Sequence, residues 1–307
     1  MIETFDIYSY LEVSESRAYE KRAEAKKQGI HVPKFLYADI AERCNLSCPG
    51  CYRAVEHTEY RERLLNVTEW DSLFREAEQL GIRYIFLTGG EPLLRRDILE
   101  RAARYSDVWF LVLTNGTLLD EQYYRFFSEH RNMIPMLCKE VCSDVDLSMN
   151  GRSSALYGRL RQAMDELSRR EIIYGATVAL TSANYQRVLS RGFLGDLRRR
   201  NCKGVLYVEY GLSGAERRNL MLEGEVRDRV EEEIHILQEE FRDMVLFTFP
   251  REGRESEKDF TGKEKVFQVT VDGYVCPRLY RNIFGENLKQ LPLREILKKD
   301  LFGDIFV

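Results

Sequence analysis

The chain has 307 residues, of which 44% are hydrophobic and 31% charged, a globular balance with room for one large α/β domain and a smaller module. No stretch has the apolar length of a membrane-spanning helix, no signal-peptide pattern follows Met1, and the net charge of -4 argues against an obligatory nucleic-acid partner. Seven cysteines, an odd count without a secretory signal, predict a reducing compartment, so we expect a cytoplasmic protein.

Strand-like and helix-like segments alternate along most of the chain. An Ala-, Glu-, Lys- and Arg-rich run at 16–28 predicts an N-terminal helix that ends at Gly29. The hydrophobic patterns then predict strands at 35–41, 83–88, 108–114, 133–139, 174–181 and 204–210. They predict helices at 68–80, 95–105, 119–130, 154–170 and 186–201. Helical crossovers require a parallel sheet, and six units are too few for a closed eight-stranded barrel, so the pattern predicts a partial (β/α)6 barrel.

A cysteine motif follows the first predicted strand. Cys44, Cys48 and Cys51 form a CxxxCxxC run on one short loop. Three thiolates at this spacing can hold three irons of a [4Fe–4S] cluster, which leaves the fourth iron open for substrate chemistry. The alternatives are a three-cysteine zinc site or a ferredoxin-like electron carrier. Zinc sites usually use four ligands, however, and no second cysteine pair or close histidine completes this one.

A second motif ends the second predicted strand, where Thr88 leads into Gly89-Gly90-Glu91-Pro92. Glycines let the backbone approach a ligand closely, because no Cβ is in the way. Glu91 is a charged acceptor for an ammonium group, and Pro92 lacks a donor and stops the strand. In parallel α/β sheets, ligands bind beyond the carboxyl ends of the strands, and both motifs lie at such ends.

These two motifs, in this order and at this spacing, resemble those of the radical S-adenosylmethionine (SAM) enzymes. The resemblance implies that Cys44, Cys48 and Cys51 bind a [4Fe–4S] cluster and that the motif from Gly89 to Pro92 receives the methionine amino group of SAM. It also implies an oxidoreductase chemistry. One electron, from a flavodoxin- or ferredoxin-type reductant, cleaves SAM to a 5′-deoxyadenosyl radical that abstracts hydrogen from the substrate.

Three further residues are candidates to contact SAM. The family usually has an aromatic residue just before the third cysteine, where this chain has Gly50, so Tyr52 is the aromatic candidate to pack near the adenine. Thr114 and Asn115 end the third predicted strand at the carboxyl edge of the sheet. Asn115 is followed by glycine, and Asn-Gly is also a generic turn signal.

Three later features each have a functional and a structural interpretation. Cys138 lies where family members commonly carry a small hydroxyl residue, and it is either a hydrogen-atom donor or a buried small hydrophobe. Glu209, on the sixth strand, contacts substrate if its face points inward and is a solvated edge residue if not. The basic run Arg198-Arg199-Arg200 either complements a helix dipole or forms a docking patch.

The composition changes after residue 214. Residues 223–243 predict a charged helix with one apolar face, and a polar, loop-rich segment follows from Phe247 to about Lys263. Runs at 266–271 and 274–277 flank an Asp-Gly pair, which is a strong hairpin signal, and a short helix closes the pattern.

This hairpin and helix are similar to the SPASM or twitch extension of peptide- and protein-modifying radical SAM enzymes. That extension binds further clusters through several cysteines, whereas the tail of this chain supplies only Cys276. We therefore expect a degenerate extension at 215–307, after an N-terminal helical segment at 1–32 and a radical SAM core at 33–214.

The resemblance implies an enzyme that modifies a peptide or protein by epimerisation or crosslinking. An enzyme acting on a small molecule is the alternative, and a non-catalytic iron–sulfur or electron-transfer protein is the rival from another class. An epimerase must return a hydrogen atom to the opposite face of its substrate. Cys276, whose chain is fixed by Pro277, is the preferred donor for that step, and Cys138 is the second candidate.

Overall fold

The computed structural model describes residues 7–48, 51, 63–138, 154–210, 220–222, 224–249, 267–276 and 285–299. The chain packs as two compact units. The first comprises Met1–Arg43, Glu59–Leu111 and Glu264–Val307, and the second comprises Cys44–Thr58 and Val112–Lys263. In the described part of the chain, none of the helices combines the length and apolarity that crossing a membrane requires.

The first unit contains the start of the parallel sheet. Its strands are β1 (Phe35–Ala41), β2 (Tyr84–Gly89), the first half of β3 (Trp109–Thr114), β8 (Phe267–Val269) and β9 (Val275–Cys276), in the order β9-β8-β1-β2-β3. β1 is parallel to β2 and to β8, and the β8–β9 hairpin is antiparallel. Every residue of β1 and β2 is buried, which explains why both strands are nearly continuous hydrophobic runs.

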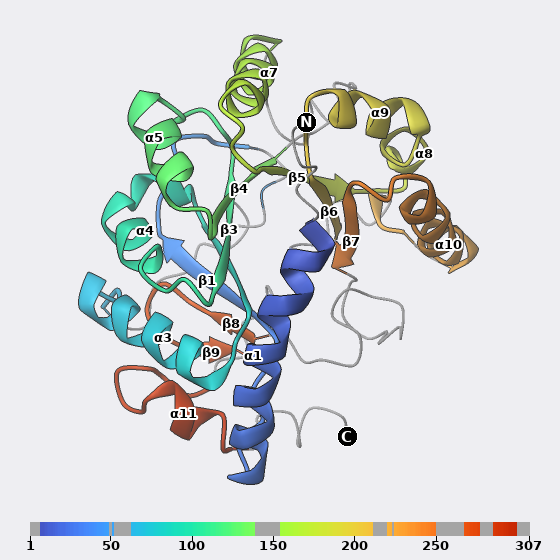
Figure 1. Ribbon diagram of the computed structural model, residues 1–307. Helices are drawn as coiled ribbons and strands as arrows, with labels where there is room; N and C mark the ends of the chain where they lie inside the picture. The colour runs from blue at the N-terminus through green and yellow to red at the C-terminus, as the bar shows by residue number, and fades with distance from the viewer. Residues whose placement is uncertain are drawn as a thin grey trace. The chain divides into compact units, whose positions relative to one another are not determined.

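The helices of the first unit are α1 (Ile7–Lys27), α3 (Val67–Leu80), α4 (Arg96–Ala102), α11 (Leu293–Ile296) and the short 3₁₀ helix η1 (Pro92–Leu94). Figure 1 labels α1, α3, α4 and α11. α3 buries one apolar stripe that includes Trp70, Phe74 and Leu80. Gly81 ends α3 in the left-handed conformation, with φ 86°. α1 packs against that end, where the Arg22 guanidinium donates to the Gly81 carbonyl at 2.8 Å.

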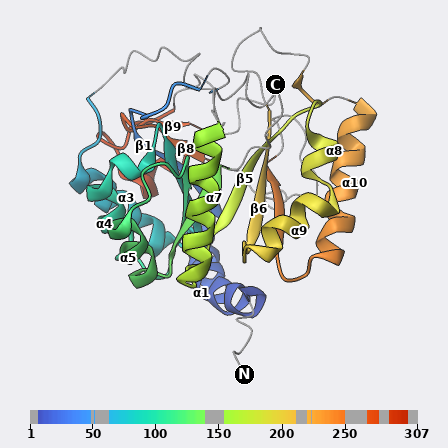
Figure 2. The ribbon, with the colours of Figure 1, turned by 90° about the horizontal axis from the view of Figure 1, so that it is seen from above.

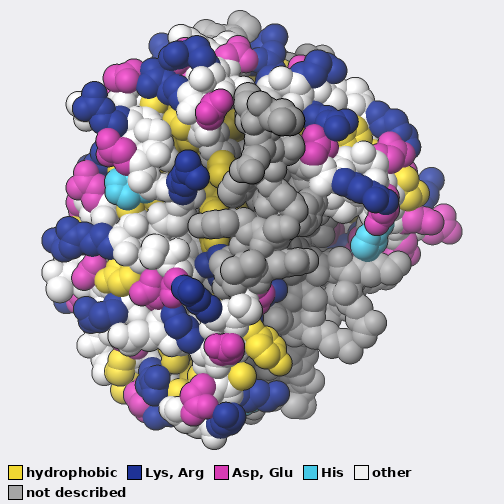
Figure 3. Space-filling view, viewed as in Figure 1, with side chains coloured by type: hydrophobic (Ala, Val, Ile, Leu, Met, Phe, Trp, Pro, Cys, Tyr) yellow, Lys and Arg dark blue, Asp and Glu magenta, His cyan; other side chains and the backbone are white. Residues whose placement is uncertain are grey.

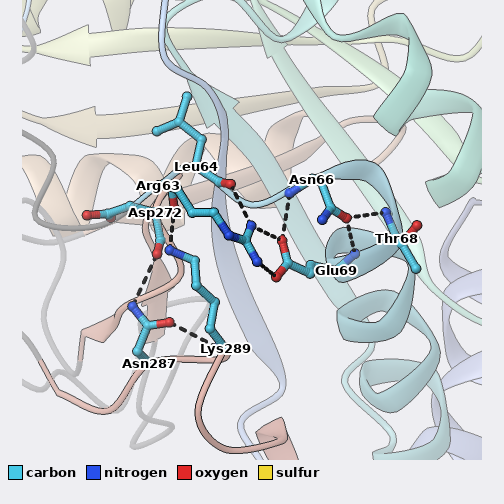
Figure 4. Close-up of polar contacts among 8 residues, drawn as sticks. All are labelled: Arg63, Leu64, Asn66, Thr68, Glu69, Asp272, Asn287 and Lys289. Atoms are coloured by element: carbon cyan, nitrogen blue, oxygen red, sulfur yellow. Dashed lines mark hydrogen bonds and ion pairs between the residues drawn. The ribbon is translucent and has the colours of Figure 1, made fainter.

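A polar network joins the start of α3 to the C-terminal segment (Figure 4). The Arg63 guanidinium forms two hydrogen bonds with the Glu69 carboxylate, at 2.8 and 2.6 Å. The Lys289 ammonium donates to the Arg63 carbonyl, and the Asn287 side chain donates to the Asp272 carbonyl at 3.1 Å. These contacts and the β8–β1 pairing build the predicted hairpin into the first unit.

Asn66 begins α3 and is the residue we expect to matter most for this helix. Its side chain accepts hydrogen bonds from the backbone of Thr68 and Glu69, and the Glu69 carboxylate accepts one from the Asn66 backbone, which is a complete capping box. Asn66→Ala should lower the free energy of unfolding in urea by about 1 kcal/mol. Asn66→Asp keeps a side-chain acceptor and should stay within about 0.5 kcal/mol of the wild type, and equal losses in both variants would contradict this role for the cap.

The second unit continues the sheet through the end of β3, β4 (Met133–Cys138), β5 (Gly175–Leu180), β6 (Gly204–Glu209) and β7 (Val245–Phe249), in that order. The pairs β4–β5, β5–β6 and β6–β7 are all parallel. The helices are α5 (Glu121–Glu129), α7 (Ser154–Arg169), α8 (Tyr185–Val188), α9 (Arg191–Arg199) and α10 (Gly224–Glu240). Figure 2 shows α8, α9 and α10 on one side of β5 and β6.

The predicted fold class is confirmed, because the mostly parallel α/β sheet does not close. Within the described residues, β7 and β9 each have a single strand neighbour. Three local expectations were wrong. The N-terminal helix predicted at 16–28 is α1, which already begins at Ile7 and ends at Lys27. The helix predicted at 186–201 is two helices, because Ser190 leaves the helical conformation and caps α9 by accepting from the Phe193 amide at 3.2 Å. The loop predicted from Phe247 begins inside β7, a seventh parallel strand next to β6.

Candidate functional site

The cysteine loop begins the second unit. None of the described cysteines forms a disulfide, and Cys44 is exposed while Cys48 and Cys51 are half-buried. The Cys51 amide donates to the Cys48 carbonyl at 3.1 Å, which makes a tight turn between these two residues. The Leu46 amide donates to the Cys44 Sγ at 3.4 Å. A donor aimed at sulfur stabilises the thiolate, which is the form that binds a metal.

Asn115 connects the end of β3 to this loop within the second unit. Its side-chain amide donates to the Cys44 Sγ at 3.7 Å and to the Asn45 side chain at 2.9 Å. The Asn45 side chain in turn donates to the Thr117 hydroxyl at 2.8 Å. The neighbouring Thr114 is buried, and its hydroxyl accepts from the Gly116 amide at 3.0 Å. Asn115 thus contacts a predicted cluster ligand, while contacts of Thr114 and Asn115 with SAM stay predictions.

The donor set of this loop fits an iron–sulfur cluster. Cys44, Cys48 and Cys51 supply three thiols that form no disulfide, and the Cys44 sulfur receives two hydrogen-bond donors. In a [4Fe–4S] cluster each cysteine binds a different iron, so the thiols need not converge on one ion. Among the residues with described side chains, no three His, Cys, Asp or Glu side chains gather around a single metal position.

The Gly89-Gly90-Glu91-Pro92 motif lies in the first unit, between the end of β2 and η1. Gly89 has φ 115°, and a Cβ there would lie 2.4 Å from the Ala41 carbonyl oxygen. The Gly90 amide donates to the same carbonyl at 2.7 Å. The backbone of the motif is therefore pressed against the end of β1, which is one physical reason for glycine at position 89.

Glu91 is buried although it carries a carboxylate. Its side chain is 1% exposed, and Oε1 accepts from the Leu93 amide at 3.0 Å, so that Glu91 is the N-cap of η1. Pro92 is the first residue of η1, where its missing amide hydrogen removes no helical bond. The cap holds the carboxylate in one orientation at the carboxyl end of β2.

The two candidate thiols have different environments. Cys138 ends β4 and is half-buried, whereas Cys276 in β9 is 1% exposed and pairs with Gln268 of β8. Tyr52 and Pro277 lie outside the described residues.

Two acids have partners that the sequence did not reveal. The Glu209 carboxylate accepts from the Arg227 guanidinium of α10 at 2.6 Å, and these side chains are only 7% and 11% exposed. Glu209 is thus a half-buried residue whose side chain is ion-paired rather than solvated. Asp39 of β1 is 3% exposed and accepts from the Gln268 side chain at 2.7 Å. The sequence signal that could have singled out Asp39 is the presence of an acidic residue inside an otherwise apolar strand.

The basic run at the end of α9 is paired with acids. Arg198 bonds to Asp243 at 2.8 Å, Arg199 lies 3.7 Å from Asp196, and Arg200 forms an ion pair with Asp165. Figure 3 shows Lys and Arg side chains interspersed with Asp and Glu on the face drawn. These pairs favour the structural interpretation over a docking patch.

An open parallel α/β sheet with a three-cysteine loop after β1 and a Gly-Gly-Glu-Pro motif after β2 is the fold and motif order expected of a radical SAM protein. The family model described as the radical SAM superfamily matches residues 39–178 of the chain.

Curated relatives match a limited part of the chain. It is 35% identical to a PqqA peptide cyclase of Rhizobium meliloti over 91 residues, which are 29% of this chain and 24% of that protein. It is 41% identical to a probable GTP 3′,8-cyclase of Methanopyrus kandleri over 83 residues, 26% of each chain. The match thus spans about a quarter of the length of these relatives.

Solved structures share the fold over most of the chain. SuiB of Streptococcus suis bound to S-adenosylmethionine superposes with a TM-score of 0.72 at 16% identity, covering 92% of this chain and 70% of that one. Native anSMEcpe with bound AdoMet and the Cp18Cys peptide superposes with a TM-score of 0.63 at 14% identity, covering 87% of this chain and 80% of that one.

Proposed function

We propose that this chain is a radical SAM enzyme, with Cys44, Cys48 and Cys51 as the ligands of one [4Fe–4S] cluster. The observation that carries the proposal is the set of three cysteines without a disulfide on one loop after β1, with Asn115 and the Leu46 amide donating to Cys44. When bound, the cluster and SAM supply one-electron cleavage to a 5′-deoxyadenosyl radical, which abstracts hydrogen from the substrate.

The residues of the chain have separate tasks in this proposal. The donors to the Cys44 sulfur favour its thiolate and orient it for iron. Glu91, held by the Leu93 amide, offers a preorganised carboxylate to the methionine ammonium of SAM. Gly90, Thr114 and Tyr52 are the further proposed SAM contacts, and Pro92 fixes the start of η1 beside Glu91.

We propose a peptide or protein as the substrate. A relative named as a peptide cyclase supports this choice, as do similar folds solved with the SuiA precursor peptide and the Cp18Cys peptide. A small-molecule substrate is the alternative, and the similarity to a probable GTP 3′,8-cyclase favours it. The electron would come from a flavodoxin- or ferredoxin-type donor. The tail at 215–307 would be a SPASM-like extension without a second cluster.

The test is anaerobic incubation of the reconstituted protein with SAM and a strong reductant, followed by chromatography of the products. An enzyme of this class forms 5′-deoxyadenosine and methionine in equal amounts. A non-catalytic iron–sulfur carrier takes up the electron and leaves SAM intact, and that result would refute the proposed function.

If the reaction is an epimerisation, alanine substitutions can show which of the two candidate thiols, Cys138 or Cys276, donates the hydrogen atom. The donor variant should still cleave SAM but fail to quench the substrate radical, so 5′-deoxyadenosine should accumulate without normal product. Partial exposure supports Cys138 as the donor, and burial supports a packing role for Cys276. We therefore expect uncoupling in Cys138→Ala and coupled turnover in Cys276→Ala, measured as the ratio of 5′-deoxyadenosine to product. Normal ratios in both variants would exclude both thiols and favour crosslinking.

A further inference from the structure

β1 contains a bulge just before the cysteine loop. Asp39 pairs with Thr88 of β2, but the next paired position is Ala41 with Gly89, so Ile40 is an extra residue in the ladder. Ile40 is fully buried. A bulged residue loses its place in the sheet hydrogen bonding, and a buried carbonyl needs another donor.

Arg95 supplies that donor. Its Nη1 donates to the Ile40 carbonyl at 3.2 Å. The same guanidinium forms a two-pronged bond with Asp97, from Nε to Oδ1 at 3.0 Å and from Nη2 to Oδ2 at 3.0 Å. Burial opposes ionisation of Asp97, but hydrogen bonding and attraction from Arg95 outweigh it and lower the pKa of this carboxyl. The planar fork thus holds Arg95 in one orientation.

Two backbone contacts continue the series toward the loop. The Gly90 amide donates to the Ala41 carbonyl at 2.7 Å, and the Glu91 amide donates to the Arg43 carbonyl at 2.8 Å. Residues 90–95 therefore bind three carbonyls of the segment 40–43, and the next residue in the chain is Cys44.

We propose that Arg95 is a positioning residue for the cluster loop. Its guanidinium, oriented by Asp97, satisfies the carbonyl that the bulge frees and sets the path of the backbone that leads to Cys44. The inference builds on the proposed function, because it concerns the same cluster ligand. Arg95 acts through the backbone of 40–43 and contacts neither cluster nor substrate in this role.

The first test uses metal-free protein and hydrogen exchange. In Arg95→Gln the Gly90 and Glu91 amides should exchange about tenfold faster than in the wild type, because the segment that accepts their hydrogen bonds loses its side-chain anchor. Arg96→Gln is the matched control, since the neighbouring Arg96 pairs with Glu100 of the same helix, at 2.9 Å along the surface of α4. Amides of β5 and β6 should be unchanged in both variants, which separates a local effect from general destabilisation.

The second test uses reconstituted protein. Iron release to a chelator should be about tenfold faster in Arg95→Gln than in Arg96→Gln. The change in the electron paramagnetic resonance spectrum of the reduced cluster on adding SAM should also differ from that of the wild type. Arg95→Lys keeps a charged donor but lacks the planar guanidinium that bonds twice to Asp97. Its iron release should therefore be slower than that of Arg95→Gln and faster than that of the wild type.

Equal exchange and equal iron release in Arg95→Gln and Arg96→Gln would overturn the proposal. Faster exchange without faster iron release would overturn it too, since Arg95 would then stabilise only the bulge. Failure of the proposed function is a different result, in which the wild-type protein itself binds no cluster or leaves SAM intact.

Discussion

Replacing Cys44, Cys48 and Cys51 together by alanine should remove nearly all iron from the reconstituted protein. The wild type should hold about four irons per chain, because one [4Fe–4S] cluster is expected at this loop. Anaerobic reconstitution followed by iron and sulfide analysis measures both values. SAM cleavage should disappear with the iron, since the electron reaches SAM through the cluster.

Cys202→Ala is the matched control for these substitutions. Cys202 is buried, and its thiol bonds to the Gly204 carbonyl at 3.3 Å, so its removal should leave the iron content unchanged. A triple variant that keeps a full cluster would show that the other four cysteines of the chain bind a cluster. The interpretation of the tail as cluster-free would then be wrong.

Glu91→Gln should keep the iron but weaken SAM binding by about tenfold to a hundredfold. A charge-assisted hydrogen bond to an ammonium is worth about 1.5–3 kcal/mol, and the variant removes the charge from a site that is 1% exposed. Glutamine keeps a side-chain oxygen for the Leu93 amide, so the start of η1 is preserved. Equilibrium binding of SAM to the reconstituted variant measures the change.

Glu91→Ala removes the cap as well as the charge and should weaken SAM binding at least as much as Glu91→Gln. Glu100→Gln, on the surface of α4, is the control that should leave the affinity unchanged. An unchanged SAM affinity in Glu91→Gln would place the methionine amino group elsewhere and would leave only the capping role for Glu91.

Local patterns predicted most of the first six strands because each is a short apolar run bounded by polar or turn residues. β1 matches the predicted range, and the other five strands differ from their predicted ranges by one residue at one or both ends. The two motifs could also be recognised from the sequence, since the residues of each lie close together in the chain and follow a predicted strand. β7 was missed because Val245–Phe249 joins a charged helix directly to a polar segment, and only its pairing with β6 shows its place in the sheet.

Contacts between distant residues depended on the tertiary structure. The hairpin signal predicted β8 and β9, but no local pattern indicated that β8 pairs with β1. The Asp39–Gln268 bond joins side chains 229 positions apart. The sequence alone determined which residues we propose for the cluster and SAM chemistry, because residue identity and spacing define those motifs. Tertiary packing decided which backbone groups position these residues. The bulge at Ile40, and the hydrogen bond that Arg95 donates to it, form only when β1 and β2 are paired.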